Sequence, residues 1–200
     1  MILPRLYPVL PDADMIARLV PLGVRLVQLR FKGDKAKVPG QIAAALAVCA
    51  RHGAQLVVND HWQAALDQGA DFIHLGQEDL DSADTAAIAR AGARLGVSTH
   101  DRAELDRALA LSPAYIALGP IWSTLLKQMP WQPQGLEKLT RWKSRIGAVP
   151  LVAIGGLTLP RLPAVFAAGA DVAAVVTDLV AAADPEAQTR LWVQATGVSV

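Results

Sequence analysis

Polar residues gather directly after short apolar runs in this sequence, and their types suit the binding of phosphate and a divalent cation. Asn59 and Asp60 follow one such run, and Asp79 comes after the next. One or two carboxylates, completed by water and phosphate oxygens, are the ligand set that Mg²⁺ prefers. Asp60 and Asp79 are therefore our candidate Mg²⁺ ligands. The alternative is that each caps a helix, Asp79 before Leu80 and Asp60 before the segment near Trp62.

Basic residues at similar places could bind a diphosphate. Gln28, Arg30 and Lys32 alternate along the chain, so an extended backbone would point all three side chains the same way. Arginine can hold a phosphate with two donors, whereas lysine acts as a point charge. We therefore predict that Arg30, Lys32 and Lys127 are diphosphate ligands. The alternative is solubility, which is the usual role of a single surface Lys or Arg.

A pair of glycines suits a phosphate in a different way. Gly155 and Gly156 follow the apolar run 151–154 and precede a predicted helix, where glycine lets backbone N–H groups approach a phosphate closely. Val176 is the last residue of the final apolar run and Thr177 follows it, and loops after strands seven and eight form a phosphate site in many barrels. The alternative is a tight turn that needs a left-handed residue.

Histidine, serine and cysteine give weaker signals. His100 follows Ser98 at the end of an apolar run, and it could be a general acid or base or a neighbour of a helix cap. His74 lies inside an apolar run, so we expect a core histidine with its hydrogen bonds satisfied. Cys49 is the single cysteine, and we expect a small buried hydrophobic residue there. No serine lies in a nucleophile elbow, and no His and Cys spacing is typical of zinc.

Eight short apolar runs must position these residues. Several lack a clean alternation of apolar and polar residues, which is typical of strands that are covered on both faces. Pro8 weakens the first prediction, because proline removes a backbone donor from the sheet. The predicted strands are Leu6–Leu10, Val24–Leu29, Leu56–Val58, Phe72–Leu75, Leu95–Val97, Tyr115–Leu118, Leu151–Ile154 and Val172–Val176.

Segments with helical character separate the runs, and an alternation of strand and helix implies a parallel sheet. An open doubly wound sheet is one solution, but eight units in a row favour a closed (β/α)8 TIM barrel. Without a linker or a composition shift, residues 1–200 are predicted to form a single compact α/β domain. The predicted helices are Asp12–Val20, Lys35–His52, Trp62–Gln68, Asp79–Ala91, Asp101–Leu109, Leu136–Ile146, Leu159–Ala168 and Pro185–Ala195.

Composition narrows the classes of partner. Hydrophobic residues make up 52% of the chain and charged residues 18%, which is the profile of a folded soluble protein. The net charge of +1 gives no sign of a nucleic-acid partner. One cysteine permits no internal disulfide, and neither a signal peptide nor a membrane span is evident. We therefore expect a cytoplasmic protein with small-molecule ligands; whether it forms a homo-oligomer is left open.

With these residues in view, the sequence resembles the thiamine phosphate synthase family over nearly its whole length. Each matching segment is short, but seven of them occur in the family's order. They are Gln28–Lys32, Asn59–Asp60, His74–Leu80, Gly96–His100, Gly119–Thr124 with Lys127, Ala153–Gly156 and Ala174–Thr177.

The resemblance implies a transferase that condenses hydroxymethylpyrimidine diphosphate with a thiazole phosphate to give thiamine phosphate and diphosphate. By analogy, Asp60 and Asp79 would hold Mg²⁺, and Ser98 would lie beside the pyrimidine and the leaving group. Gln28, Arg30, Lys32, Asn59 and Lys127 would hold the pyrimidine diphosphate, and Thr124, Gly155, Gly156, Val176 and Thr177 the thiazole phosphate. The candidate catalytic residues are Arg30, Lys32, Ser98 and Lys127.

One departure from the family's pattern falls in the candidate substrate site. The family often has a threonine where this chain has Leu126, and leucine cannot donate a hydrogen bond to phosphate. If nothing compensates, the lost bond costs about 1.5–3 kcal/mol. The segment 121–134 around this position is also the candidate for a lid over the site.

Two alternative functions share the same barrel. A thiazole tautomerase would use a histidine such as His100 as its acid–base group, whereas a catalytically silent paralogue would bind thiazole phosphate without turnover. Leu126 is the one observation in favour of the silent paralogue. Because a tautomerase needs no grip on a diphosphate, the retained cations and carboxylates favour the synthase.

Overall fold

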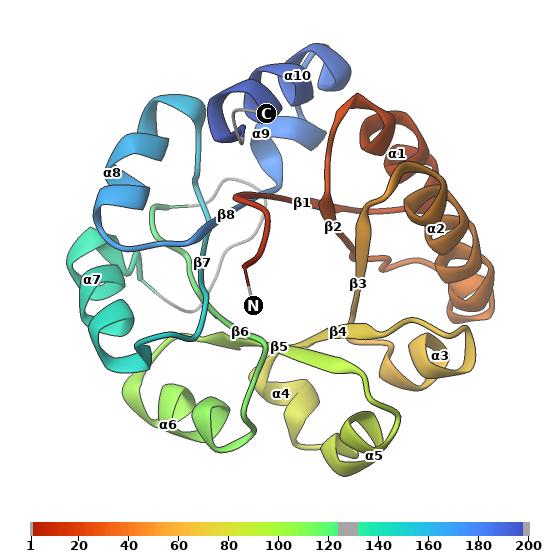
Figure 1. Ribbon diagram of the computed structural model, residues 1–200, viewed down its shortest axis with the longest axis horizontal. Coiled ribbons are helices and arrows are strands. Elements are labelled where there is room, and N and C mark those ends of the chain that lie inside the picture. The colour runs from red at the N-terminus through yellow and green to blue at the C-terminus, as the bar shows by residue number, and fades with distance from the viewer. Residues whose placement is uncertain (1, 124–131, 198–200) are drawn as a thin grey trace.

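Eight parallel strands form a closed barrel in the computed structural model, which describes residues 2–123 and 132–197 (Figure 1). Strand β1 (Leu6–Leu10) pairs with β2 (Leu26–Leu29) on one side and with β8 (Val172–Val175) on the other, which closes the sheet. Helices surround the strands on the outside (Figure 1). The predicted (β/α)8 barrel is confirmed, and the open doubly wound sheet is wrong.

The strands follow the predicted apolar runs closely. Pro8 lies within β1 and is paired in register with Val175, so the missing donor does not interrupt that strand. The prediction of a strand from Val24 was wrong by two residues, because β2 begins at Leu26 after the exposed Arg25. The remaining strands are β3 (Gln55–Asn59), β4 (Phe72–Leu75), β5 (Arg94–Thr99), β6 (Tyr115–Leu118) and β7 (Leu151–Ile154).

The helices also follow the prediction, except that one predicted helix is divided in two and one short helix at the end of β8 was not predicted. Asp79–Ala91 is two helices, α4 (Gln77–Leu80) and α5 (Thr85–Arg90), because Asp84 accepts from the N–H of Ala87 and starts a new helix. The others are α1 (Ala13–Leu19), η1 (Val20–Leu22), η2 (Lys35–Lys37), α2 (Val38–His52), α3 (Trp62–Asp67), α6 (Arg102–Ala110), α7 (Gly135–Ile146), η3 (Leu159–Arg161), α8 (Leu162–Ala167), α9 (Thr177–Val180) and α10 (Pro185–Thr196).

Two hydrophobic clusters form the core. The larger cluster fills the layer between strands and helices, and it includes the buried Cys49, as expected. The smaller cluster fills the barrel interior with alternate residues of the strands, such as Tyr7, Leu26, Phe72 and Tyr115. Because side chains alternate along each strand, the residues two positions after these interior residues also point inward, at the carboxyl end of the barrel.

The sequence contains no evident membrane span, and the helices of the structure can be compared with that prediction. Among residues 2–123 and 132–197, no helix is long and apolar enough to cross a membrane.

Candidate active site

Four neighbouring strands each carry one inward-facing polar residue near the carboxyl end. Gln28 lies on β2, Asn59 on β3, His74 on β4 and Ser98 on β5. Asn59 and His74 are paired in register, which places them side by side. Gln28, Asn59 and His74 are buried, whereas Ser98 is partly exposed. The structure thus brings together three of the predicted substrate-binding residues, with His74 between them.

Two tyrosines that the sequence did not single out connect these residues. The amide Nε2 of Gln28 donates to the hydroxyl of Tyr7 at 2.8 Å, and the hydroxyls of Tyr7 and Tyr115 are 2.9 Å apart. The Tyr115 hydroxyl lies 2.8 Å from Nδ1 of His74, whose Nε2 lies 2.8 Å from Oγ of Ser98. A continuous hydrogen-bonded chain therefore crosses the barrel interior from β2 to β5.

The imidazole of His74 is satisfied at both nitrogens, as expected for a core histidine. Burial lowers the pKa of His74 to about 4, and the positive charge of Arg30 acts in the same direction although the carboxylate of Asp60 opposes it. The ring is therefore neutral at pH 7, so one nitrogen is a donor and the other an acceptor.

Asp60 lies just beyond β3 in a left-handed backbone conformation, with φ at 63°. Such a conformation is uncommon outside glycine, although aspartate tolerates it better than most residues. The N–H of Asp60 donates to the carbonyl of His74 at 3.0 Å, and its carboxylate forms an ion pair with Lys32. The side chain of Asp60 therefore faces Lys32 across the end of the barrel, and the alternative that it caps α3 is wrong.

The carboxyl groups of Asp60 and Asp79 are close enough for each to shift the pKa of the other. Burial would raise the pKa of Asp60, but the hydrogen bond and charge of Lys32 outweigh it and hold that pKa below its ordinary value. Burial and the negative charge of Asp60 raise the pKa of Asp79. Of the two carboxyls, Asp79 therefore loses its proton less readily than a free aspartate, because it is partly buried and lies beside a second negative charge.

Asp79 also has a structural role in α4. Its Oδ2 accepts from the backbone N–H of Gly76, the N-cap residue, at 3.2 Å, which is one half of a capping box because glycine has no side chain to make the second bond. The alternative that Asp79 is itself the N-cap is wrong in its position, but the carboxylate does stabilise the helix start. This contact holds the side chain of Asp79 next to Asp60.

The two predicted diphosphate ligands that the structure describes, Lys32 and Arg30, differ in exposure and in their partners. Lys32 reaches Asp60 from an exposed position, whereas Arg30 is half-buried after the end of β2. With the described residues, the guanidinium of Arg30 makes no hydrogen bond. Lys127 lies outside the described residues, together with Thr124 and Leu126.

The loop after β7 is shaped by its two glycines. Gly155 and Gly156 have φ angles of 95° and 67°, in the left-handed region. A Cβ on Gly155 would lie 2.6 Å from Cα of Pro120, and one on Gly156 would lie 2.8 Å from Cβ of Trp122. The left-handed turn that was the alternative explanation for the pair is therefore present, and its role with phosphate stays a prediction.

Val176 and Thr177 lie beside this loop at the end of β8. Thr177 is the first residue of the short helix α9, which was not predicted. Asp178 anchors α9, because its carboxylate accepts from the Trp192 indole and the Gln188 amide, each at 2.7 Å. The loops after β7 and β8 thus have the arrangement that many barrels use for phosphate.

Two further predicted features lie at this end of the barrel, His100 and the candidate lid 121–134, and the structure describes the lid only in part. Nδ1 of His100 lies 2.9 Å from the carboxylate of Glu104, so that side chain is held at the start of α6. The flanks of the candidate lid are tied down, because Gln134 donates from its backbone to Pro120 at 2.8 Å. Residues 124–131 of that segment lie outside the described residues.

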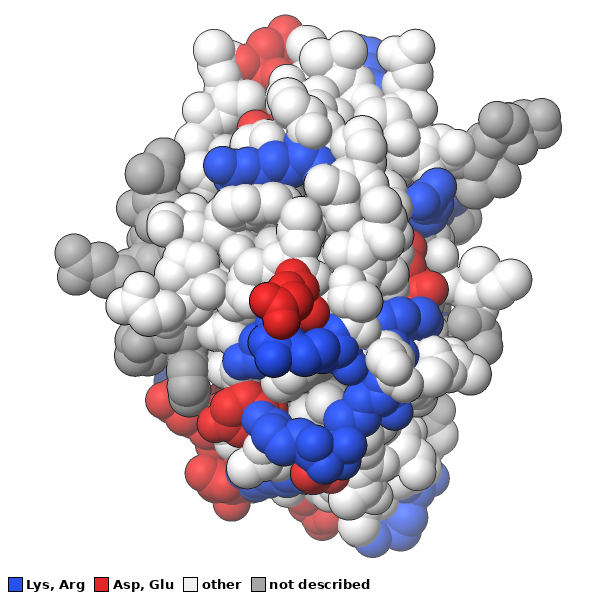
Figure 2. All heavy atoms as spheres, turned by 90° about the vertical axis from the view of Figure 1, so that its left-hand side faces the viewer, with Lys and Arg blue, Asp and Glu red and all other residues white. Residues whose placement is uncertain are grey.

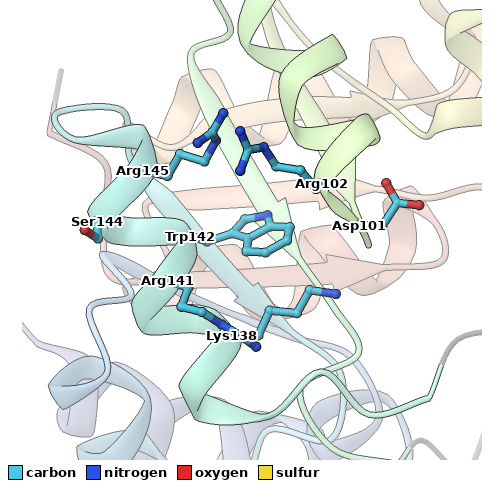
Figure 3. Close-up of a pocket in the computed structure, with 7 residues that line it drawn as sticks. All are labelled: Asp101, Arg102, Lys138, Arg141, Trp142, Ser144 and Arg145. Atoms are coloured by element: carbon cyan, nitrogen blue, oxygen red, sulfur yellow. The ribbon is translucent and has the colours of Figure 1, made fainter.

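A groove of about 680 Å³ lies on the outside of the barrel, between α6 and α7 (Figure 3). Arg102 and Arg145 point toward each other there, and both bind Asp106, at 2.8 and 2.9 Å. On this side of the molecule Lys and Arg side chains lie next to Asp and Glu side chains (Figure 2). The groove's Lys138 binds the carbonyl of His100. These cations are engaged within the fold, so we place the candidate active site inside the barrel end.

Comparison with known proteins identifies the family of the chain. A family model described as thiamine monophosphate synthase matches residues 6–179. A thiamine-phosphate synthase of Rhizobium etli is 56% identical over 191 residues, which cover 95% of this chain and 94% of that protein. One from Neisseria meningitidis serogroup A is 50% identical over 191 residues, covering 94% and 92%.

A solved structure agrees at the level of the fold. The thiamine phosphate pyrophosphorylase from Pyrococcus furiosus superposes with a TM-score of 0.85 at 21% identity, covering 96% of this chain and 95% of that one. The family match spans most of the sequence, and the curated relatives are similar over nearly their whole length. The chain therefore belongs to the thiamine monophosphate synthase family, and it is an enzyme of the transferase class.

Proposed function

We propose that the chain condenses hydroxymethylpyrimidine diphosphate with a thiazole phosphate, which gives thiamine phosphate and releases diphosphate. The observation that carries this proposal is the pair of neighbouring carboxyls, Asp60 and Asp79, beside the cation Lys32 at the end of the barrel. A site of this charge pattern suits a metal-bound diphosphate. Membership of the family supplies the reaction that such a ligand would undergo.

The two carboxyls fit a magnesium ion. They lie next to each other, and the pKa of Asp79 is raised by burial and by the charge of Asp60, so a cation between them would relieve their repulsion. Mg²⁺ bound by Asp60 and Asp79 would neutralise charge on the phosphate oxygens of the first substrate. Carboxylate oxygens are also the ligands that Mg²⁺ prefers over nitrogen.

The cations of the chain would hold the diphosphate itself. Arg30 offers several donors that no described residue uses, and Lys32 contributes an exposed positive charge at the rim. Lys127 would add a third positive charge. As the carbon–oxygen bond breaks, its electron pair leaves with the diphosphate, and these side chains would stabilise the charge that develops there.

The thiazole phosphate would lie at the loops after β7 and β8. The left-handed Gly155 and Gly156 leave no side chain between their backbone and a ligand, and Thr177 adds a hydroxyl. Thr124 would complete this half, whereas Leu126 would contribute no donor. Val176 would also hold the thiazole phosphate, whereas Gln28 and Asn59 would hold the pyrimidine diphosphate and Ser98 would lie beside it.

This arrangement needs no nucleophile from the protein. Departure of diphosphate leaves a pyrimidine methylene cation, which the amino-substituted ring stabilises, and the lone pair of the thiazole nitrogen then forms the new carbon–nitrogen bond. The protein's contribution would be to hold the two substrates in line and to exclude water. Ser98 is placed beside the reacting carbon in this proposal.

The tautomerase alternative has less support. It would use His100 as an acid–base group, and Nδ1 of that side chain is already held by Glu104. The residues that a tautomerase does not need, Asp60, Asp79 and Lys32, form the most specific constellation in the site.

A turnover assay tests the proposal. Purified protein is mixed with Mg²⁺, hydroxymethylpyrimidine diphosphate and thiazole phosphate, and thiamine phosphate is measured after oxidation to fluorescent thiochrome. We expect product from the wild type, and a loss of at least about a hundredfold on adding EDTA or in Asp60→Ala, because transition-state charge loses its main stabilisation. Asp67→Ala, which removes an exposed carboxylate from α3, is the matched control and should retain full activity.

Two results would contradict the proposal. Turnover that survives both EDTA and Asp60→Ala would show that the reaction does not need a metal ion at this site. Folded protein that binds thiazole phosphate in calorimetry but forms no thiamine phosphate would instead support the tautomerase or the silent paralogue.

A further inference from the structure

The hydrogen-bonded chain inside the barrel has a direction. An amide nitrogen can only donate, so Tyr7 accepts from Nε2 of Gln28. The single proton of Tyr7 then points to the hydroxyl of Tyr115, its other partner. If Tyr115 donated to Tyr7 instead, the proton of Tyr7 would have no acceptor among the described residues. A buried donor without a partner is costly, so the protons run from β2 toward β5.

The same reasoning fixes the state of His74. Tyr115 donates its proton to Nδ1, so the neutral ring carries its own proton on Nε2. That N–H donates to Oγ of Ser98 at 2.8 Å. The oxygen of Ser98 is therefore occupied as an acceptor, while its proton is left to point elsewhere.

We propose that this chain holds Ser98 as a hydrogen-bond donor toward the pyrimidine diphosphate, and that Tyr115 is the positioning residue that sets the chain. The inference rests on the proposed function, which supplies the substrate beside Ser98. Diphosphate oxygens can only accept hydrogen bonds, so a serine held as a donor is matched to them. Tyr115 is fully buried and acts through His74, without touching the substrate.

The fold reserves space for this hydroxyl. Gly96 on β5 is paired in register with Tyr115 on β6. A Cβ at Gly96 would lie 2.1 Å from Cζ of Tyr115 and 2.6 Å from its hydroxyl oxygen. The Tyr115 ring also stacks on His74, with 5.6 Å between centroids and 9° between planes. A glycine inside a strand usually weakens it, and here it is what lets the tyrosine reach His74.

The tautomer of His74 is measured first, because it does not depend on activity. Protein labelled with ¹⁵N at histidine separates protonated from unprotonated ring nitrogens by chemical shift, and His74→Asn identifies the signals of this residue among the four histidines. We expect the proton on Nε2 in the wild type. In Tyr115→Phe, Nδ1 loses its donor, so the signals should move toward a mixture of tautomers.

Kinetics then test the role of Ser98. Tyr115→Phe should lower kcat about tenfold or more, since a misdirected or missing hydrogen bond to the reacting substrate weakens transition-state binding. The KM for thiazole phosphate should be unchanged. Phe72→Leu is the matched control, because Phe72 packs against the Tyr115 ring at 5.6 Å but carries no hydroxyl. It should lower stability while changing kcat by less than about twofold.

A second variant keeps the test decisive if Tyr115→Phe does not fold. Tyr7→Phe breaks the chain one step earlier and should lower kcat in the same direction by a smaller factor. The double variant should be no slower than Tyr115→Phe alone, because both changes interrupt one chain.

Three outcomes would overturn the inference. A wild-type His74 protonated on Nδ1 would reverse the chain and make Ser98 the donor to histidine. An equal loss of kcat in Phe72→Leu would reduce the role of Tyr115 to packing. A wild type that forms no thiamine phosphate would defeat the proposed function and the role of Ser98 with it, while the Nε2–H tautomer would still establish the direction of the chain.

Discussion

The two halves of the barrel's carboxyl end are lined by different groups, side chains in one half and backbone in the other. In the half formed by the ends of β2 to β5, side chains converge and fix one another, from Gln28 through His74 to Ser98. In the half formed by the loops after β7 and β8, Gly155 and Gly156 offer backbone and no side chain. We refer to these as the side-chain half and the backbone half.

The two halves are held in place by different interactions. In the side-chain half, the hydrogen-bonded chain connects strands that are not neighbours, so position depends on a network. In the backbone half, position depends on close packing, because Gly155 lies where even a methyl group would meet Pro120. Changes in the side-chain half should therefore alter chemistry, and changes in the backbone half should alter shape and stability.

The largest stability effect is expected in the backbone half. Gly156→Ala places a Cβ 2.8 Å from Trp122 at a left-handed position, which should cost about 2–5 kcal/mol in the free energy of unfolding. Gly53→Ala is the matched control, because Gly53 is also left-handed, with φ at 63°, but apart from its neighbours in the chain no atom of the described residues lies within 4 Å of its Cβ position. It should cost only the backbone strain, about 1–2 kcal/mol. Urea denaturation measures both, and equal losses would remove close packing as the cause.

A smaller effect is expected from the carboxyl pair in the side-chain half. The pKa of Asp79 is raised in the folded state, so its contribution to stability is full below the unfolded pKa of about 4 and is lost as pH rises through the folded pKa. Asp60 has a lowered pKa, and its contribution is present at neutral pH and lost on acidification. At pH 7 without metal, Asp79 therefore opposes folding and Asp60 supports it.

Asp79→Asn should consequently stabilise the metal-free protein at pH 7, by no more than about 1 kcal/mol because the carboxyl is only partly buried and solvent screens its charge. The asparagine oxygen can still accept from Gly76, so the start of α4 is kept. Thermal denaturation in EDTA should show a rise in Tm of up to about 4 °C at pH 7, which disappears near pH 4. Mg²⁺ should raise the Tm of the wild type but not of the variant. A variant that is less stable at pH 7 in EDTA would contradict this account.

Structural features that are set by residues close together in the sequence could be predicted. Continuous apolar runs gave the strands, because strands buried on both faces need apolar side chains at every position. Asp60 and Asp79 could be found because Asp60 directly follows β3, Asp79 lies in the first turn after β4, and the ends of parallel strands meet at one side. The split of Asp79–Ala91 was missed, since Asp84 is a capping residue that a helical pattern can also contain.

Contacts between distant strands could not be predicted in this way. Tyr7 and Tyr115 lie 108 residues apart, and each looks like one more apolar residue in its run. Only closure of the barrel brings their hydroxyls together. The role of Gly96 could not be predicted either, because this position must be glycine only to make room for the ring of Tyr115 on the next strand. A polar atom on an aromatic residue at an inward position is the signal that could have found them.

The most direct test of the account is calorimetric binding of the two substrates, each alone, to one variant from each half. Arg30→Ala should weaken hydroxymethylpyrimidine diphosphate with Mg²⁺ about 10- to 100-fold and leave thiazole phosphate unchanged, since it removes a charged hydrogen bond from the side-chain half. Gly156→Ala should weaken binding of thiazole phosphate and leave binding of hydroxymethylpyrimidine diphosphate unchanged. Arg90→Ala, which removes an exposed arginine from α5, should change neither affinity. If Arg30→Ala and Gly156→Ala weaken both substrates equally, the division of the site into two halves is wrong.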